Sequence, residues 1–427
     1  MKTVGLITEY NPFHNGHAWH MQEAKRLTGA DFCVVVMSGD FVQRGAPAIL
    51  NKYSRTEMAL ACGADLVLEL PVTYALGSAE YFASGAVSLL DELGIVDTLC
   101  FGSECGDIDT MLQIARILNE EPKEYRNLLK ENLKSGKSFP LARAEALSEY
   151  SGHSRKCDDS ILQEPNNILG IEYLKALFRL KSRICPVTIM RTGGAYHSDS
   201  LNETMSSATA IRKILCAPWH LLRSLPEPAH LLTSLENEMP DSCFEILKQN
   251  FGKSCPVQSS DFSLPLHYRL LSVSSPEELS SYQDVSSELA DRIFHLIPSF
   301  VNLDQFAALV KSKQYTESRI RRCLYHILLD IRSQDTEQRK QQGWNGYARV
   351  LGFRKESSVL LGEIKRKSSL PLVTKLANAK QQLDAEQMSF LKRDIFASEI
   401  YQSIVTSKFE QGSYNEYRQP VIVYTNS

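Results

Sequence analysis

The first hundred residues alternate short apolar runs with longer amphipathic ones, and this alternation restricts the possible folds more than any other feature. The apolar runs cover residues 4–7, 31–37, 66–70 and 96–101, and they are bounded by Gly, Asp or Pro. Runs of this length that are partly β-branched predict strands. The segments between them, at 16–28, 52–62 and 77–93, have helical periodicity. The pattern therefore predicts an α/β fold, in which a parallel sheet is covered by helices on both faces.

Ligands of such sheets bind at the carboxyl ends of the strands. The segments that follow the predicted strands are 8–17, 38–44 and 102–104, so we expect them on one rim. A further strand is predicted at 185–190 (CPVTIM). The stretch "SSATAIRKIL" then begins a helix, because its serines are good N-cap residues.

At 427 residues the chain favours two domains. We place the boundary near residue 225, where "SLPEPAH" interrupts the pattern, which gives domains at 1–225 and 226–427. Helices are expected almost throughout the second domain, including "RVLGFRKESSVLLGEIKRK". Its clearest helix, "SRIRRCLYHILLDIRS", has an apolar stripe that contains Ile320, Leu324 and Ile327, whereas Arg319, Arg322, His326 and Arg332 lie largely off the stripe.

Charge and composition narrow the class of protein. Residues 301–427 hold 20 Lys and Arg against 13 Asp and Glu, and the rest of the chain holds 27 against 37. The basic C-terminal part suggests contact with a polyanion, although a solvated helix face explains the charge equally well. The sequence has no apolar run long enough for a membrane helix and no secretory signal, so we expect a cytoplasmic protein. The ten scattered cysteines are expected to be mostly buried or idle thiols.

The stretch "TEYNPFHNGH" carries the first chemical signal, with His14 and His17 on either side of Asn15 and Gly16. A helix N-terminus offers free N–H groups and a partial positive charge to an anion, and glycine allows phosphate to approach the backbone. A metal site is the weaker alternative, because no third ligand accompanies this spacing. Surface histidines are the remaining alternative. The sequence therefore favours phosphate binding by His14 and His17, whereas His20 is not expected to be catalytic.

A second motif strengthens the first. "SSATAIRK", residues 206–213, resembles the second signature of the HxGH nucleotidylyltransferase superfamily, in which a serine or threonine and an arginine hold phosphates. Ala208 is inserted before the threonine, so the partner of Arg212 is uncertain. The full set of motifs, "GLITEYNPFHNGH", "SGDFVQRGAPAILNKYSRTEMAL", "GADLVLELP", "FGSE", "PNNILGIEY" and "RTGGAYHS", resembles the bacterial tRNA(Met) cytidine acetate ligases.

This resemblance implies a Rossmann-like nucleotidylyltransferase domain of the HIGH type, followed by a mostly helical, basic, tRNA-binding region. It implies that acetate and ATP form acetyl-adenylate, and that the acetyl group then passes to N4 of the wobble cytidine in the anticodon loop of elongator tRNA(Met). It also implies roles for His14, His17 and Arg212 in catalysis. The implied ATP-binding residues are Ile7, Thr8, Glu9, Tyr10, Asn11, Pro12, Phe13, His14, Asn15, Gly16, His17, Gly102, Asn167 (or Asn166) and Arg191.

Several assignments rest on residue chemistry alone. Asp40 is a candidate ligand for Mg²⁺, with a helix or turn cap as the alternative. The candidates for contact with acetate or phosphate are Gln43, Arg44, Lys52 and Arg55. The candidate RNA contacts are Arg319, Arg321, Arg322, Lys365, Arg366, Lys367, Lys392 and Arg393, with Trp344 or Tyr347 to stack on bases. We expect no membrane or DNA partner. The main alternative function is a small-molecule nucleotidylyltransferase of the coenzyme-forming type.

Overall fold

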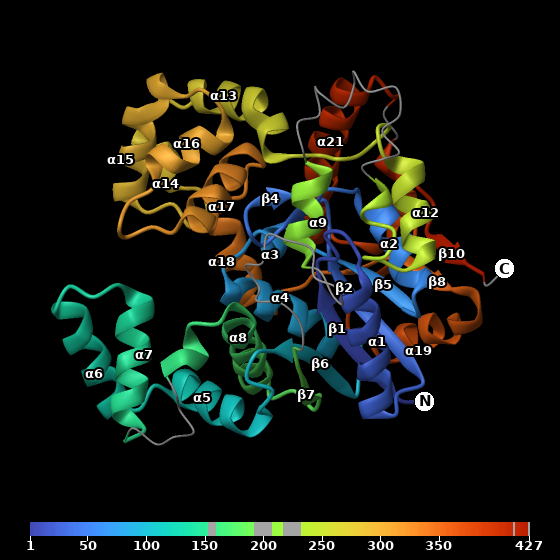
Figure 1. Ribbon diagram of the computed structural model, residues 1–427, viewed down its shortest axis with the longest axis horizontal. Helices are drawn as coiled ribbons and strands as arrows, with labels where there is room; N and C mark the ends of the chain where they lie inside the picture. The colour runs from blue at the N-terminus through green and yellow to red at the C-terminus, as the bar shows by residue number, and fades with distance from the viewer. Residues whose placement is uncertain (153–158, 192–206, 217–231, 413–414, 426–427) are drawn as a thin grey trace.

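The computed structural model of the protein describes residues 1–152, 159–191, 207–216, 232–412 and 415–425. One sheet organises the molecule (Figure 1). Its strands lie in the order β10-β8-β5-β2-β1-β6-β7, and β9 pairs with β8. The bounds are β1 (Thr3–Thr8), β2 (Phe32–Ser38), β5 (Leu66–Leu70), β6 (Thr98–Ser103), β7 (Cys185–Met190), β8 (Ala348–Arg354), β9 (Leu372–Val373) and β10 (Ile422–Tyr424). A separate hairpin pairs β3 (Phe41–Val42) with β4 (Ala46–Pro47).

The strand order reverses between β1 and β6, and this places the ligand-binding edge. β5, β2, β1, β6 and β7 are all parallel. The chain adds β2 and β5 on one side of β1 and then returns to add β6 and β7 on the other side. In open α/β sheets, ligands bind outside the carboxyl ends of the strands at such a reversal. The predicted strands are confirmed, with β6 displaced by two residues from the expected range.

Helices cover both faces of the sheet, as the alternating pattern predicts. In β2, Cys33, Val35 and Met37 face a core that α1 and α2 complete, whereas Val34 and Val36 face a second core with α4, α5 and α8. Both faces of the strand are buried, which explains its continuous apolar sequence. The helices up to residue 250 are α1 (Asn15–Thr28), α2 (Lys52–Ala61), α3 (Val72–Ala75), α4 (Ala79–Glu92), α5 (Ile108–Glu120), α6 (Lys123–Lys134), α7 (Phe139–Tyr150), α8 (Pro165–Leu180), α9 (Ala208–Leu215) and α12 (Asp241–Asn250).

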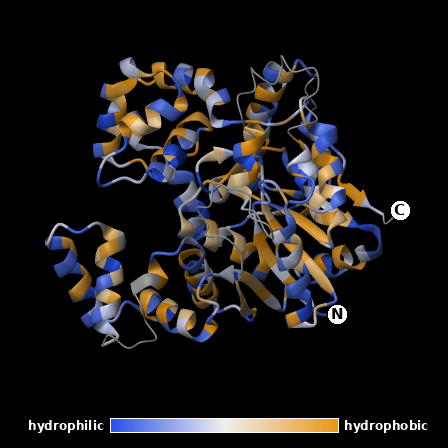
Figure 2. Ribbon diagram, in the orientation of Figure 1, coloured by the Kyte–Doolittle hydropathy of each residue, from blue (hydrophilic) through white to orange (hydrophobic). Residues whose placement is uncertain are grey.

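The C-terminal region is mostly helical and forms a third core, in which α13 to α17 pack against the second half of α21. Figure 2 shows many of its helices with hydrophobic and hydrophilic stretches on the same ribbon, as expected for amphipathic elements. Their bounds are α13 (Ser263–Leu271), α14 (Pro276–Ser280), α15 (Ser287–Leu296), α16 (Leu303–Val310), α17 (Glu317–Leu328), α18 (Ser333–Gln341), α19 (Val359–Lys367), α20 (Ala379–Gln382) and α21 (Ala385–Phe409).

Two details of the C-terminal prediction are wrong. Residues 348–354, expected to be helical, form β8, which pairs antiparallel with β5 and brings strands from both sides of residue 225 into one sheet. A short apolar run can form either a strand or a helix. Here pairing with β5, which lies about 280 positions earlier in the chain, makes it a strand. In α17 the apolar stripe is confirmed. His326 is fully buried, however, and its ring nitrogens face the carbonyls of Gln283 and Leu76 at 2.8 and 3.0 Å.

The nine cysteines among the described residues are all free thiols and five of them are buried, as expected for mostly buried or idle thiols. Within the same part of the chain, every helix is too short or too polar to cross a membrane.

Candidate active site

The predicted ligand-binding residues gather at the reversal point between β1 and β6. The β1–α1 loop carries residues 9–14, and β6 ends at Ser103 beside the start of the loop that follows β7. The Arg191 amide donates to the Ser103 carbonyl at 2.9 Å. α9, which carries Arg212, lies over the same edge in Figure 1. The rim that the sequence predicts is therefore present.

His14 and His17 form a reciprocal cap at the N-terminus of α1. The Gly16 amide donates to Nδ1 of His14 at 3.0 Å, and the His14 amide donates to Nδ1 of His17 at 3.3 Å. The two rings lie close together, with centroids 3.7 Å apart. Because each Nδ1 accepts a hydrogen bond, the proton of each neutral ring resides on Nε2. Both imidazoles therefore have an N–H available for a ligand oxygen.

The surroundings keep both imidazoles neutral. Burial, together with the charges of Arg191 and Arg212, lowers the pKa of His14 to about 3. Burial also lowers the pKa of His17 well below its ordinary value, and His14 and Arg191 add to the effect. At neutral pH the pair therefore offers two neutral donors, and the nearby positive charge comes from the arginines.

The helix amides of α1 are occupied, contrary to the expectation that they are free for phosphate. The Asn15 amide donates to the Glu238 carbonyl at 3.1 Å, and the Asn15 side chain donates to the Asn237 carbonyl at 2.7 Å. The Gly16 amide is bonded to His14. The expectation of phosphate binding at this loop therefore narrows to the imidazole Nε2–H groups and the arginines as donors. A phosphate can reach the Asn15 amide only if the Glu238 carbonyl moves.

The remaining residues of the β1–α1 loop hold it in place. Tyr10 and Phe13 are buried and their rings pack against each other and against His17. The Asn11 side chain accepts from the Ile49 amide at 2.8 Å. Glu9 accepts from the Gln43 amide of the β3–β4 hairpin at 2.8 Å. These side chains therefore support the loop, and its contact with ATP remains a prediction.

Arg212 reaches the same loop from α9. Its Nη1 donates to the Asn11 carbonyl at 2.6 Å, and its Nη2 donates to Thr209 Oγ1 at 3.0 Å. Thr209 precedes Arg212 by three residues, so it lies on the same helix face despite the inserted Ala208. Ser207 caps α9 by accepting from the Ala210 amide at 3.1 Å. The partner that the sequence left uncertain is Thr209, and Arg212 joins the two signature motifs. Ser206 lies outside the described residues.

Gly102, Asn167 and Arg191 lie together at the end of β6. A Cβ atom on Gly102 would be 3.2 Å from Cγ of Arg191, so the glycine lets the arginine lie flat against the strand. Asn167 is buried, and its Oδ1 accepts from the amides of Glu104 and Cys105 at 2.9 and 3.1 Å. Glu104 in turn accepts from Asn166 and Asn167 at the start of α8. Asn166 and Asn167 both hold this loop in place. Residues 192–198 of "RTGGAYHS" lie outside the described residues.

Arg55 and Lys52, expected near acetate or phosphate, are fully buried structural residues instead. The Arg55 guanidinium donates to the carbonyls of Glu9, Ser38, Gly39 and Leu50. It therefore joins the loops that follow β1 and β2. The expectation that Arg55 contacts acetate or phosphate is therefore wrong. The burial of Arg55 is set by tertiary packing, which the sequence does not reveal.

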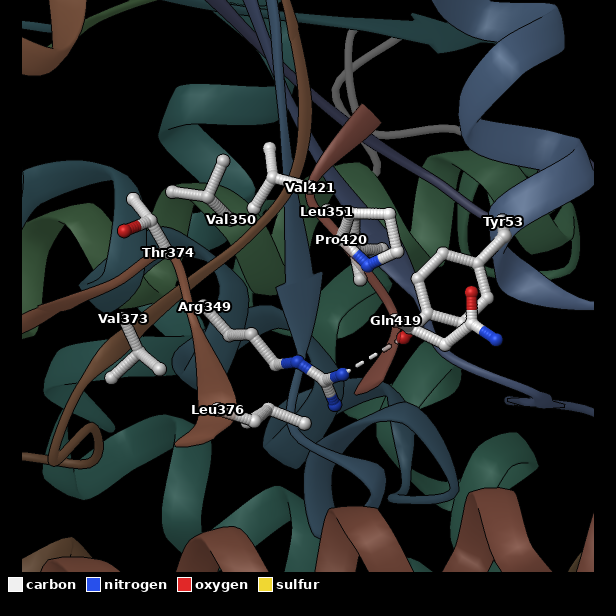
Figure 3. Close-up of a pocket in the computed structure, with 10 residues that line it drawn as sticks. All are labelled: Tyr53, Arg349, Val350, Leu351, Val373, Thr374, Leu376, Gln419, Pro420 and Val421. Carbon is white, nitrogen blue, oxygen red and sulfur yellow. Dashed lines mark hydrogen bonds between the residues drawn. The ribbon is translucent and has the colours of Figure 1, made fainter. Parts of the chain in front are cut away.

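Lys52 belongs to a buried charge cluster that also contains Glu69, Arg349 and Glu416. The Lys52 ammonium lies 2.9 Å from Glu69 and 2.5 Å from Glu416, and Arg349 lies 2.7 and 2.8 Å from the same two carboxylates. Arg349 also donates to Tyr53 at 3.1 Å beside a cavity of about 10 Å³ (Figure 3). That volume suits a single water molecule and no ligand.

Asp40 acts as a cap next to this cluster. Its Oδ1 accepts from the Lys52 amide at 2.8 Å, and its Oδ2 lies 3.9 Å from the Lys52 ammonium. Burial raises the pKa of Asp40. In the described part of the chain, no three His, Cys, Asp or Glu side chains are grouped to hold a metal ion. These surroundings fit the cap and do not fit a protein-bound Mg²⁺.

The candidate RNA residues are dispersed over the molecule. Arg319 and Arg322 lie on α17, and Gly45 of the β3–β4 hairpin packs on the α17 backbone beside Arg322. Lys365, Arg366 and Lys367 are exposed at the end of α19. Lys367 contacts Gly94, which precedes β6 and so lies at the amino edge of the sheet, opposite the active site. Trp344 and Tyr347 are buried, so the expectation that they stack on RNA bases is wrong.

The fold, the imidazole pair and the arginine on α9 together define a HIGH nucleotidyl transferase, and the model of that family matches residues 1–416. The tRNA(Met) cytidine acetate ligase of Acetivibrio thermocellus is 42% identical over 424 residues, which cover 99% of this chain and all of the relative. That of Thermoanaerobacter sp. (strain X514) is 46% identical over 402 residues, or 94% and 95% of the two chains. The chain belongs to the tRNA(Met) cytidine acetate ligase family.

Solved structures agree. Thermotoga maritima TmcAL bound with alpha-thio ATP superposes with a TM-score of 0.89, at 32% identity over the full length of both chains. The apo form of that protein gives a TM-score of 0.90 at the same identity and coverage.

Proposed function

We propose that this chain activates acetate with ATP and acetylates N4 of the wobble cytidine in the anticodon loop of elongator tRNA(Met). In the first step an acetate oxygen attacks the α-phosphorus, and pyrophosphate leaves as acetyl-adenylate forms. In the second step the cytidine N4 attacks the acetyl carbon, AMP leaves, and N4 loses a proton. The products are N4-acetylcytidine and AMP.

The observation that carries the proposal is the pair of neutral imidazoles beside two arginines at the reversal point of the sheet. Attack on phosphorus needs groups that hold the phosphates in line and stabilise negative charge as it moves to the leaving pyrophosphate. The Nε2–H groups of His14 and His17 are suited to donate to phosphate oxygens. Arg212 and Arg191 supply positive charge close to both rings. In the part of the chain that the structure describes, no three His, Cys, Asp or Glu side chains are grouped to hold a metal ion, so we propose that Mg²⁺ arrives bound to the ATP phosphates.

The test is acetate-dependent chemistry on RNA. Purified protein is incubated with labelled acetate, ATP and total tRNA. The label incorporated into RNA and the pyrophosphate released into solution are then measured. We expect label in elongator tRNA(Met) and its loss in a His17→Ala variant. The matched control is His295→Ala, which removes an exposed histidine on α15. Adenylyl transfer to a small molecule without need of acetate would favour a coenzyme-type nucleotidylyltransferase and refute the proposal.

We further propose that the tRNA lies along α17 rather than α19. α17 contacts the β3–β4 hairpin, whose Gln43 is hydrogen bonded to Glu9 of the β1–α1 loop, so this surface is continuous with the active site. Arg319 and Arg322 are both partly exposed on this helix; Arg319 donates to the Asp284 carbonyl at 3.1 Å, and Arg322 lies 3.7 Å from the Asp284 carboxylate. Arg319 is the residue we test, because it bonds only the carbonyl of Asp284 and leaves the charge of its carboxylate to Arg322. Arg319→Gln should raise the KM for tRNA and leave the KM for ATP unchanged. The matched control replaces Lys365, Arg366 and Lys367 with Gln, and a larger effect from this control would place the RNA at the opposite edge.

A further inference from the structure

Two cysteines from distant parts of the chain meet where α2 ends and α12 begins. Cys62 ends α2, Cys243 lies in the first turn of α12, and their Sγ atoms are 3.4 Å apart. They are 181 positions apart in the sequence. Cys62 is half-buried and Cys243 is fully buried. One sulfur is therefore accessible to a small solute, and the other lies directly behind it.

We propose that Cys62 and Cys243 are an oxidation-sensitive pair that forms a reversible intrachain disulfide when the protein meets a peroxide. A disulfide needs an S–S distance of about 2.0 Å, so each sulfur would move by roughly 0.7 Å. Disulfides in reducing compartments are mostly transient and redox-sensing, which suits a pair that is reduced in the resting protein.

The surroundings distinguish the two sulfurs. A hydrogen bond from Cys243 lowers the pKa of Cys62, and Ser242 and the charge of Arg354 act in the same direction. The Arg354 guanidinium lies at the end of α2, where it donates to the carbonyl of Leu60 at 2.6 Å. The hydrogen bond to Cys62, together with burial, raises the pKa of Cys243. Cys62 is therefore the attacking thiolate and Cys243 the resolving thiol.

The reaction balances with hydrogen peroxide as the oxidant. The Cys62 thiolate attacks one peroxide oxygen, the O–O bond breaks, and hydroxide leaves a sulfenic acid behind. The Cys243 sulfur then attacks the Cys62 sulfur, the S–O bond breaks, and the disulfide forms. Cys243 gives up its proton, and the two oxygens leave as two water molecules. The two thiols lose two electrons, which the peroxide gains, and a dithiol reverses the change.

The bond would act on the ATP site through the turn that leads into α12. In this turn the carbonyls of Asn237 and Glu238 accept hydrogen bonds from Asn15, which lies between the two catalytic histidines. A disulfide at Cys243 fastens α12 to α2 and so keeps the Glu238 carbonyl on the Asn15 amide. A phosphate of ATP can reach that amide only if the Glu238 carbonyl moves away, so the disulfide would weaken ATP binding. This consequence rests on the proposed function. It predicts that the oxidised protein has a higher KM for ATP, by about 2- to 10-fold, and that a dithiol restores the original value.

Peptide mapping tests the pair independently of any activity. The full-length protein is treated with hydrogen peroxide, remaining thiols are alkylated, and the digest is analysed by mass spectrometry. We expect a reducible cross-link between the peptides that hold Cys62 and Cys243. Cys243→Ser should remove it and leave Cys62 to oxidise to the sulfinic acid. The matched control Cys255→Ser, at another buried cysteine, should keep it.

Each result bears on one part of the inference. A wild-type Cys62 that stays reduced, or that becomes sulfinic without a cross-link, overturns the pair. A cross-link with an unchanged KM for ATP overturns its coupling to the active site. Absence of acetate-dependent activity would refute the proposed function and leave the peptide map unaffected, so the two failures are distinguishable.

Discussion

Replacing His17 with two different amides would separate the two nitrogens of its ring. The Nδ1 atom accepts from the His14 amide at 3.3 Å, and Nε2 is left to donate to a ligand. An asparagine oxygen reaches approximately the position of Nδ1, whereas the glutamine amide nitrogen reaches approximately that of Nε2. His17→Asn should therefore keep the helix cap and lose the ligand contact, and His17→Gln should do the opposite.

The size of each effect follows from the bond that is lost. A hydrogen bond to a charged group contributes about 1.5–3 kcal/mol, so His17→Asn should lower kcat/KM for ATP by roughly 10- to 150-fold. Its free energy of unfolding should stay close to the wild-type value. For His17→Gln we expect a smaller loss of activity, together with a loss of about 0.5–1 kcal/mol in stability, because the 3.3 Å cap is long.

The assay is the initial rate of acetate-dependent pyrophosphate release over a range of ATP concentrations, with urea unfolding of the same preparations. The ranking of the two variants decides the question. If His17→Asn is the more active enzyme, or if it is as unstable as it is inactive, then His17 serves the fold of α1 and its Nε2 does not contact the phosphates.

Three further predictions concern the charges around the site. Because His14 and His17 are already neutral, kcat/KM for ATP should be flat from pH 6 to 8 with respect to both rings, whereas an imidazolium mechanism would lose activity above pH 6.5. Arg55→Lys should lower stability by about 1–3 kcal/mol for each carbonyl left without a donor and raise the KM for ATP, as measured by urea unfolding and kinetics. Burial alone would raise the pKa of Glu416, but Lys52 and Arg349 lower it to about 2. This pKa shift contributes about 3 kcal/mol to the free energy of unfolding, present above pH 4.5 and lost as the pH falls towards 2. In urea unfolding, Glu416→Gln should therefore be less stable than the wild type at pH 7 and equally stable near pH 2. Equal stability at pH 7 would contradict this reasoning.

The part of the site that sequence predicts well is local in the chain. His14 and His17 are three residues apart at a strand-to-helix junction, so their common face and their position on the rim follow from helix geometry. The resemblance to a known family supplied Arg212, and the structure places it against the carbonyl of Asn11. In both cases a short stretch of sequence contains the information needed.

The parts that sequence missed depend on partners far away in the chain. Arg55 has the composition of a ligand-binding residue, and only the folded structure shows four carbonyls around its guanidinium. Lys52 is similar, since its partner Glu416 lies more than 360 positions away. Occupation of the Asn15 amide by Glu238 also follows from tertiary contact. Motifs indicate which residue types a site needs, but they do not indicate which of them face the ligand.

The antiparallel strand β8 also affects how this protein is made. β5 is an interior strand of the completed sheet, between β8 and β2, and all five of its residues are buried. Until residues 348–354 leave the ribosome, β5 is an apolar strand with one unpaired edge. During translation the nascent chain therefore carries an aggregation-prone edge for most of its synthesis. A transcript truncated before this point would give a chain that resembles a complete nucleotide-binding domain in its motifs but has an unfinished sheet.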